Sequence, residues 1–201
     1  MLLNERKFLD VDGIRTCYYE KGDGPIMVLL HGGNFGSNDA ADCSLDWGLN
    51  FDKKSFNVIK SKKTPFILHH MQGTPKNMQK NPKYDDALLD IFDFFENKIN
   101  FCIKKKFKRE LIIVDPGIGF GKNLKHNLRI MSKISIFHSL GCPILIGTSK
   151  KRFIEHIVTK FDTPDRTGGT LASVLYGLSQ GVQLFRVHNV KEINQGILVF
   201  N

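Results

Sequence analysis

The sequence predicts an α/β fold in which four parallel strands alternate with helices, preceded by an N-terminal β hairpin and strand. Three observations support this fold class. After residue 60, short apolar runs alternate with longer segments whose apolar residues recur at helical spacing. Polar, glycine-containing segments follow the short runs, as loops do at the carboxyl ends of parallel strands. Before residue 52, turn sequences rather than helices separate the apolar runs.

The N-terminal part of the chain predicts a β hairpin and one further strand. Residues 8–11 and 14–20 flank Asp12-Gly13, a dipeptide favoured in the type I′ turns of hairpins. Residues 26–30 form an uninterrupted apolar run, which predicts a buried strand, and the glycine-rich residues 31–37 follow as a loop. We therefore expect residues 1–54 to form a segment of their own.

The remainder of the chain, residues 55–201, predicts four strands interleaved with five helices. Gly141 and Gly181 provide stop signals for two of these helices. The predicted strands cover residues 66–68, 111–114, 143–146 and 183–187. The predicted helices cover residues 85–107, 124–140, 151–158, 171–179 and 191–199. Strands that are separated by helices pair in parallel through right-handed crossovers.

Composition narrows the classes of function. The 201 residues include 29 Lys and Arg against 20 Asp and Glu, and the resulting net charge of +9 favours anionic partners. The positive charge is scattered and no nucleic-acid-binding motif accompanies it, so we expect no nucleic-acid partner. The longest apolar run is too short to span a bilayer, and the first residues do not resemble a signal peptide. Four cysteines without a CxxC pair predict free thiols, so we expect a cytoplasmic protein without a membrane partner.

Polar and glycine residues follow each predicted strand of the second part. Residues 69–73 follow the first strand, residues 115–122 the second and residues 147–151 the third, while Arg186 and His188 lie at the end of the fourth. Because the carboxyl ends of parallel strands meet at one edge, these residues are expected to converge there. One carboxylate, several cations and a histidine suit a ligand that has a hydrogen-bonding ring and a phosphate.

Four of these segments resemble the motifs of dihydropteroate synthase, a pterin-binding transferase. The segments are His-Met-Gln-Gly-Thr-Pro at 70–75, Asp-Pro-Gly-Ile-Gly-Phe-Gly-Lys at 115–122, Gly-Thr-Ser-Lys-Lys-Arg-Phe-Ile at 147–154 and Arg-Val-His at 186–188. They occur in the family's order, and the resemblance covers residues 55–201. It implies a partial TIM-type (β/α) barrel made of the last four βα units, a pterin-binding half barrel.

The resemblance also implies a set of site residues. Asp115 would hydrogen-bond the pterin ring, since a carboxylate can accept two neighbouring N–H donors. Arg186 and His188 would hold the pyrophosphate, and together with Lys151 they are the expected catalytic residues. The full set of expected substrate-binding residues is Met71, Asp115, Gly119, Phe120, Gly147, Lys151, Arg186 and His188. From the residues alone, Asp115 could instead be a turn residue and Lys151 part of a solvated helix face.

The implied reaction joins 6-hydroxymethyl-7,8-dihydropterin pyrophosphate to p-aminobenzoate in folate biosynthesis. The family implies assistance by Mg²⁺, but its metal-binding asparagine has no counterpart before residue 55, so no metal ligand is assigned. Two positions depart from the family: Lys150 stands where the family usually has Arg, and Asn189, beside the leaving-group site, stands where it usually has Asp. A half barrel also exposes strand edges, which predicts pairing with residues 26–30, association as a homodimer, or poor stability.

Two other functions compete with this one. Residues 8–51 resemble the N-terminal start of an α/β-hydrolase, and Ser149, Asp165 and His188 occur in hydrolase order. However, Lys151 occupies the last position of the G-x-S-x-G pattern, where the sharp turn needs a small residue, so this triad is interpreted as accidental. The second alternative is a non-catalytic fragment that binds a pterin or a phosphate.

Overall fold

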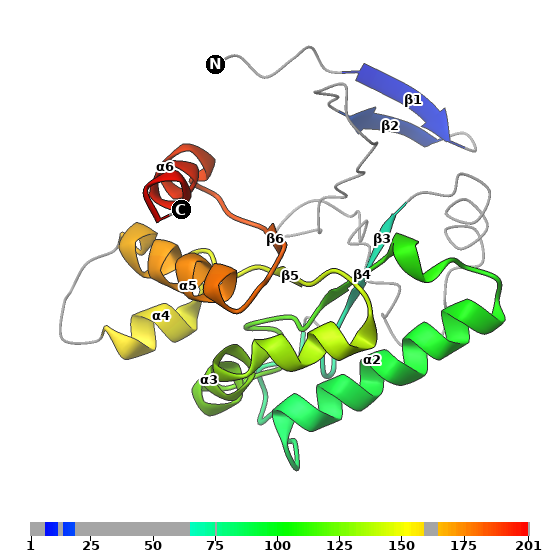
Figure 1. Ribbon diagram of the computed structural model, residues 1–201, viewed down its shortest axis with the longest axis horizontal. Helices are drawn as coiled ribbons and strands as arrows, with labels where there is room; N and C mark the ends of the chain where they lie inside the picture. The colour runs from blue at the N-terminus through cyan, green and yellow to red at the C-terminus, as the bar shows by residue number, and fades with distance from the viewer. Residues whose placement is uncertain (1–6, 12–13, 19–64, 75, 159–164, 201) are drawn as a thin grey trace.

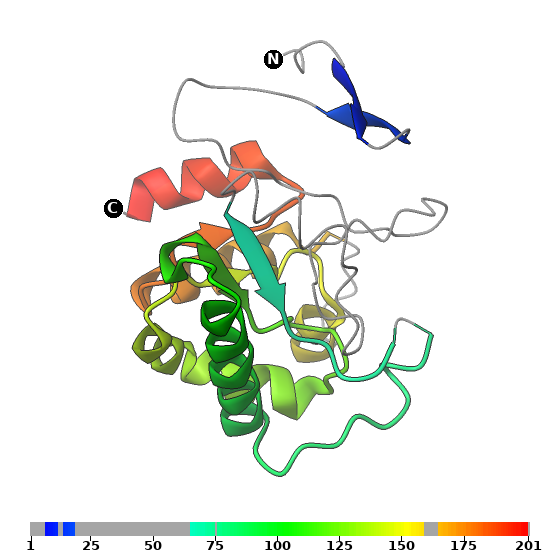
Figure 2. The same cartoon turned by 90° about the vertical axis from the view of Figure 1, so that its right-hand side faces the viewer.

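The computed structural model describes residues 7–11, 14–18, 65–74, 76–158 and 165–200. The predicted hairpin is confirmed: β1 (Lys7–Val11) and β2 (Ile14–Tyr18) pair antiparallel, with Val11 opposite Ile14. In both Figure 1 and Figure 2 this hairpin stands apart from the helical body. The predicted strand at 26–30 and the loop at 31–37 lie outside the described residues.

Four parallel strands form the centre of the body, as predicted. They are β3 (Phe66–His69), β4 (Ile112–Asp115), β5 (Leu145–Ile146) and β6 (Leu184–Phe185). β3 pairs in parallel with β4, and β5 pairs in parallel with β6. A single parallel bridge between Val114 and Ile144 joins the two pairs, so the strands lie side by side in chain order. This confirms the α/β class and brings the four carboxyl ends to one edge.

Helices follow each strand, with two of them between β5 and β6. They are α2 (Ala87–Lys104), α3 (Leu124–Ser132), α4 (Arg152–Ile157), α5 (Thr167–Ser179) and α6 (Val190–Phe200). The longest, α2, is capped by Asp86, whose carboxylate accepts a hydrogen bond from Leu88 N at 2.8 Å and pairs with Arg129 of α3 at 2.7 Å. None of the helices in the described part of the chain combines the length and apolar character needed to cross a bilayer.

Two predicted helix boundaries were wrong. The predicted helix at 124–140 is instead an α-helix to Ser132 and a 3₁₀ helix at Ile134–Leu140, separated by Lys133, whose φ of −137° lies outside the helical range. α5 begins at Thr167, four residues before the predicted start. The first turn of α5 packs against Ile154 of α4, and a Cβ on Gly169 in this turn would clash with that side chain. The glycine that weakens the helical pattern in the sequence is therefore required by packing.

The core forms where alternate strand residues face the helices. Phe66, Leu68, Ile112 and Val114 join one large cluster with the apolar face of α2. The intervening strand residues point to the opposite face, where Ile67, Ile113 and Leu145 form a smaller cluster with Leu184. A sheet that buries both faces is typical of parallel α/β folds, and it holds the strand ends in fixed positions.

Truncation of the α2 core face should lower stability by an amount that burial determines. Ile99 is fully buried, so we expect Ile99→Val to lower the free energy of unfolding by about 1 kcal/mol. Ile103, one turn later on the same helix, is partly exposed, and Ile103→Val provides the matched control. Urea unfolding of both variants checks the prediction, and equal losses would contradict the assignment of the buried face.

Candidate functional site

The carboxyl ends of the strands meet at a buried carboxylate. Asp115, the last residue of β4, is completely buried. Its Oδ1 accepts a hydrogen bond from Gly117 N at 2.8 Å, and its Oδ2 accepts one from Arg186 Nη2 at 2.9 Å. Arg186 follows β6, and its side chain remains 47% exposed. The pair therefore combines a buried, hydrogen-bonded carboxylate with a guanidinium group that is partly exposed to solvent.

The loop after β4 approaches its neighbours so closely that it requires glycine. Gly117 has φ +66°, and a Cβ there would overlap the carbonyl oxygen of His70. Gly119 has φ +81°, and a Cβ there would lie 3.0 Å from Lys151 Cδ. The alternating glycines of the motif thus let the backbone pass between the end of β3 and the loop after β5.

Side chains from outside the strand ends fix this loop. Asn127 of α3 is buried, and its Oδ1 accepts a hydrogen bond from Gly119 N at 2.7 Å while its Nδ2 donates to Asn123 O at 2.8 Å. Tyr84 donates its hydroxyl proton to Gly121 O at 2.8 Å. Sequence reasoning assigned no role to Asn127 or Tyr84, although both lie within or near the motifs.

The structure brings Lys151 and Phe120 into direct contact. The Nζ of Lys151 lies 3.8 Å from the centroid of the Phe120 ring, a cation–π geometry. The ring also contacts the edge-on imidazole of His69, 4.7 Å away between centroids. Phe120 therefore stands between the end of β3 and the loop after β5.

A buried lysine lies beneath the same loop. The Nζ of Lys122 is 2.9 Å from His70 Nδ1, and it donates to Phe120 O at 2.9 Å. The pKa of Lys122 is lowered to about 7, chiefly because the ammonium is buried; the charge of Asp115 opposes this shift and the charge of Lys151 adds to it. Burial and Lys122 also hold the pKa of His70 well below its usual value. The sequence contains Lys122 only as the last letter of a motif and gave no reason to expect it inside.

This lysine should leave a signature in the pH dependence of stability. Because its pKa falls from 10.5 in the unfolded chain to about 7 in the folded chain, the unfolded chain binds more protons between these values. Lys122 therefore makes wild-type stability rise from pH 7 to pH 10, and Lys122→Met should lack that rise. Urea unfolding of both proteins at pH 7 and pH 10 tests this. Parallel pH curves for the two proteins would contradict it.

The loop after β5 holds the residues that follow β6. The Oγ of Ser149 accepts a hydrogen bond from His188 N at 3.1 Å and lies 2.9 Å from His188 Nδ1. A Cβ on Gly147 would lie 3.2 Å from Arg186 Nε, so the glycine makes room for the guanidinium. Ser149 is thus a site residue that sequence reasoning considered only as a rival nucleophile.

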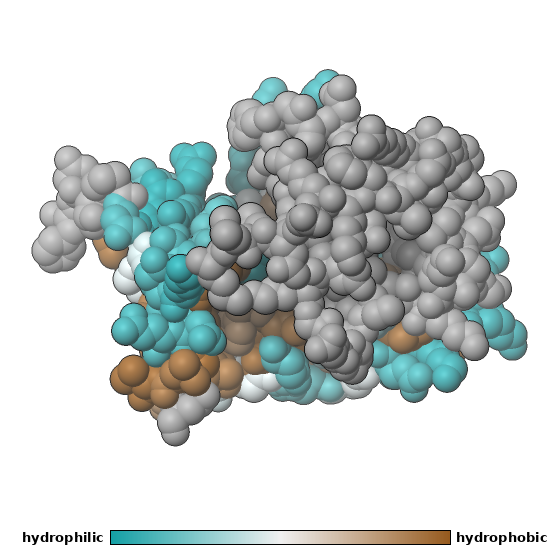
Figure 3. Space-filling view, turned by 90° about the horizontal axis from the view of Figure 1, so that it is seen from above, coloured by the Kyte–Doolittle hydropathy of each residue, from teal (hydrophilic) through white to brown (hydrophobic). Residues whose placement is uncertain are grey.

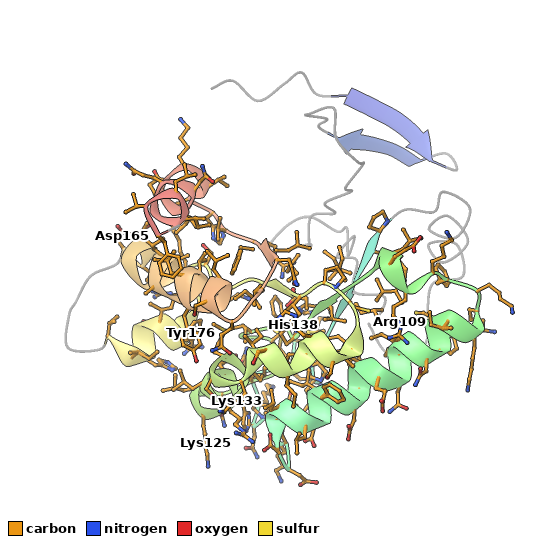
Figure 4. The ribbon with its side chains drawn as sticks, in the orientation of Figure 1. Arg109, Lys125, Lys133, His138, Asp165 and Tyr176 are labelled. Carbon is orange, nitrogen blue, oxygen red and sulfur yellow. The ribbon has the colours of Figure 1, made fainter. Side chains whose placement is uncertain are left out.

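The contacts give the hydrolase alternative no support. The carboxylate of Asp165 lies at the N-terminal end of α5, where it accepts hydrogen bonds from Thr167 N at 2.9 Å and Thr167 Oγ1 at 2.6 Å (Figure 4). A nucleophile elbow strains the nucleophile itself, whereas the left-handed residue here is Lys150, with φ 55°. The Ser149 hydroxyl is occupied in positioning His188.

Most of the predicted site residues are brought together by these contacts. Seven of the eight make the contacts just described: Asp115, Gly119, Phe120, Gly147, Lys151, Arg186 and His188. Met71 is half-buried and follows His70, whose N–H donates to Asp115 O at 2.9 Å. Within the described ranges, no three His, Cys, Asp or Glu side chains lie close enough together to hold a metal ion.

Comparison with known proteins identifies relatives of this arrangement. The family model described as pterin binding enzyme matches residues 42–188. The dihydropteroate synthase of Escherichia coli K12 is 38% identical over 135 residues, which are 67% of this chain and 48% of that protein. The chain therefore spans about half the length of this curated relative.

Solved structures show the same likeness in three dimensions. Yersinia pestis dihydropteroate synthase in complex with a sulfonamide drug matches with a TM-score of 0.69 at 35% identity, over 73% of this chain and 53% of that one. The Thermus thermophilus enzyme in complex with 6HMPPP matches with a TM-score of 0.68 at 28% identity, over 74% of this chain and 59% of that one. These likenesses indicate an α/β fold of the TIM-barrel type.

Proposed function

The chain belongs to the pterin-binding enzyme family, and we propose that it is a dihydropteroate synthase-like transferase of folate biosynthesis. The reaction would condense 6-hydroxymethyl-7,8-dihydropterin pyrophosphate with p-aminobenzoate. The names of the relatives support this, and one similar enzyme has been solved in complexes with 6HMPPP and with 4-aminobenzoate. The observation that carries the proposal is the completely buried Asp115, which is held by Arg186 at the meeting point of four strand ends.

Asp115 is proposed to recognise the pterin ring. A carboxylate can accept two neighbouring N–H donors, and the edge of an aminopyrimidinone offers such a pair. Burial strengthens these hydrogen bonds because little water competes for them. Gly119 and Phe120 would line the floor beside the ring, and Met71 and Gly147 would complete its walls.

The cations at the rim are proposed to act on the pyrophosphate. Arg186 carries a partly exposed planar fork, which can bind phosphate oxygens through two hydrogen bonds. His188 lies two residues further along the same strand end, held by Ser149. Lys151 would contact the pterin and add positive charge from the loop after β5. Positive groups that are fixed before reaction stabilise the charge that develops on a departing pyrophosphate.

The half-barrel architecture is proposed together with this function. The four strands β3–β6 and their helices would form the last four βα units of a TIM-type barrel, with residues 55–201 as the pterin-binding part. Residues 1–54 would form the separate N-terminal segment. The described residues offer no fitting cluster for the Mg²⁺ that the family implies, so no step proposed here passes through a metal.

Self-association is proposed for the C-terminal helix. α6 exposes Leu198, Val199 and Phe200, and Figure 3 shows apolar side chains gathered at one edge of the described surface. Exposed apolar clusters favour association, and a second copy of the chain would give the homodimer expected from sequence. Sedimentation velocity should show a dimer in the wild-type chain and a shift toward monomer in Leu198→Lys.

Release of pyrophosphate is the direct test of the function. The 201-residue chain, mixed with 6-hydroxymethyl-7,8-dihydropterin pyrophosphate, should release pyrophosphate only when p-aminobenzoate is present. The expected product is dihydropteroate, identified by mass spectrometry in equal amount to the pyrophosphate. Binding of the pterin without release on addition of p-aminobenzoate would overturn the transferase proposal and leave a pterin-binding protein.

A further inference from the structure

Lys150 has a backbone conformation that needs support from its surroundings. Its φ is 55°, in the left-handed region that side-chain-bearing residues enter at an energetic cost. It is not a glycine, and it stands between two site residues, Ser149 and Lys151. Such strain persists only where neighbouring groups over-determine the conformation.

Two side chains of the α5 start supply that support. The Oγ1 of Thr170 accepts a hydrogen bond from Lys150 N at 3.0 Å and donates one to Arg166 O at 2.8 Å. The Nη1 of Arg166 donates to Lys150 O at 2.9 Å. Both backbone polar groups of Lys150 are therefore held from one helix end, and the Thr170 side chain is buried there.

The support extends in both directions. Arg166 is itself anchored, since its Nη2 pairs with Glu155 of α4 at 2.6 Å. One turn further along α5, Ser173 donates its hydroxyl proton to Thr148 Oγ1 at 2.9 Å. The loop after β5 is thus attached to α5 at Thr148 and Lys150. Both residues belong to the turn in which Lys151 N donates a hydrogen bond to Thr148 O at 3.2 Å.

From this we infer that Thr170 and Arg166 are positioning residues, which hold Lys150 in its left-handed turn and so place the Lys151 ammonium over Phe120. The turn at Lys150 sets the direction in which the Lys151 side chain leaves the backbone. That side chain runs close beside Gly119 and ends with its Nζ 3.8 Å from the centroid of the Phe120 ring. The role assigned to Lys151 in pterin binding rests on the proposed function. The placement of its side chain does not.

The first test measures placement without any ligand. Ring current from Phe120 should shift the ε-methylene protons of Lys151 upfield in ¹³C-lysine-labelled protein, with the signal assigned by its loss in Lys151→Met. We expect the shift to disappear in Thr170→Val, which removes the hydroxyl at equal size, and to persist in Thr170→Ser, which keeps it. An unchanged signal in Thr170→Val would overturn the inference, as would its loss in Thr170→Ser.

The second test asks whether the strained turn is what Thr170 supports. Glycine adopts positive φ without cost, so Thr170→Val/Lys150→Gly should recover the upfield signal that Thr170→Val loses. A double variant that stays as altered as Thr170→Val would show that the hydroxyl acts only on the packing of α5, and would overturn the inference. If Thr170→Val does not fold, Arg166→Gln replaces it, because Arg166 is partly exposed. Loss of the upfield signal is again expected in Arg166→Gln. Persistence of the signal would contradict the inference.

The third test connects placement to the ligand. Affinity for 6-hydroxymethyl-7,8-dihydropterin pyrophosphate should fall about 10-fold in Thr170→Val and stay within about 2-fold of wild type in Thr170→Ser. If wild type does not bind this compound, the proposed function fails while the ligand-free result stands. A third outcome is that Thr170→Val loses the upfield Lys151 signal but binds the compound as tightly as wild type. That result would show that Thr170 places Lys151 but that Lys151 has no role in pterin binding.

Discussion

Asp115→Ala is expected to lower the affinity of the chain for 6-hydroxymethyl-7,8-dihydropterin pyrophosphate by at least about 100-fold. Hydrogen bonds to a charged acceptor contribute about 1.5–3 kcal/mol each, and the carboxylate can accept two from the ring. The variant also releases Arg186, whose Nη2 now donates to Asp115 Oδ2 at 2.9 Å. Isothermal titration calorimetry measures the loss directly.

Two controls separate recognition from general damage. Asp115→Asn keeps the size of the side chain and an acceptor for Gly117 N, but it offers an NH₂ group where the ring needs a second acceptor. We expect it to bind nearly as weakly as Asp115→Ala while unfolding closer to wild type. Asp93→Ala, at an exposed position of α2, should bind normally. Near-normal affinity in Asp115→Asn would show that the carboxylate does not recognise the pterin ring through two accepted hydrogen bonds.

Gly117→Ala is expected to have the largest effect on stability, lowering the free energy of unfolding by at least about 3 kcal/mol. Its φ of +66° disfavours any side chain, and the added Cβ would overlap the backbone oxygen of His70. His70 follows β3, and its N–H donates a hydrogen bond to the backbone oxygen of Asp115 at the end of β4. His70 therefore cannot move away from the new Cβ without breaking this hydrogen bond between the two strand ends. Thermal and urea unfolding measure the loss.

Gly168→Ala is the matched control for that substitution. Gly168 lies in the first turn of α5, and a Cβ there would meet nothing within 4 Å. Alanine forms helix more readily than glycine, so this variant should be unchanged or more stable by up to about 1 kcal/mol. Equal destabilisation by the two substitutions would contradict the close approach described at Gly117.

The features that local sequence determines were predictable. Short apolar runs between helical segments identified all four strands, and parallel pairing followed from the intervening helices. Asp12-Gly13 placed the hairpin because few other dipeptides suit its turn. The motifs named Asp115 and Arg186, and Lys151 and Phe120, which the structure places in two contacting pairs, since carboxyl ends of parallel strands converge wherever the strands pair.

The features that tertiary contacts determine were not predictable. The break after Ser132 occurs at Lys133, whose φ is −137°, and helical periodicity continues through it. Lys122 is buried because His70 and Phe120 O lie within reach, and nothing local marks it as different from the exposed lysines. Thr170 lies twenty residues from the Lys150 backbone that it holds, so its role appears only once α5 is packed.

The proposed function requires that the residues around Asp115 at the strand ends bind a pterin ring. An NMR titration of ¹⁵N-labelled wild-type chain with 6-hydroxymethyl-7,8-dihydropterin pyrophosphate tests it most directly. We expect saturable one-site binding, with the largest amide shifts at Gly117, Gly119 and Gly147, beside the Asp115–Arg186 pair. Absence of saturation, or shifts confined to surfaces away from these loops, would contradict it.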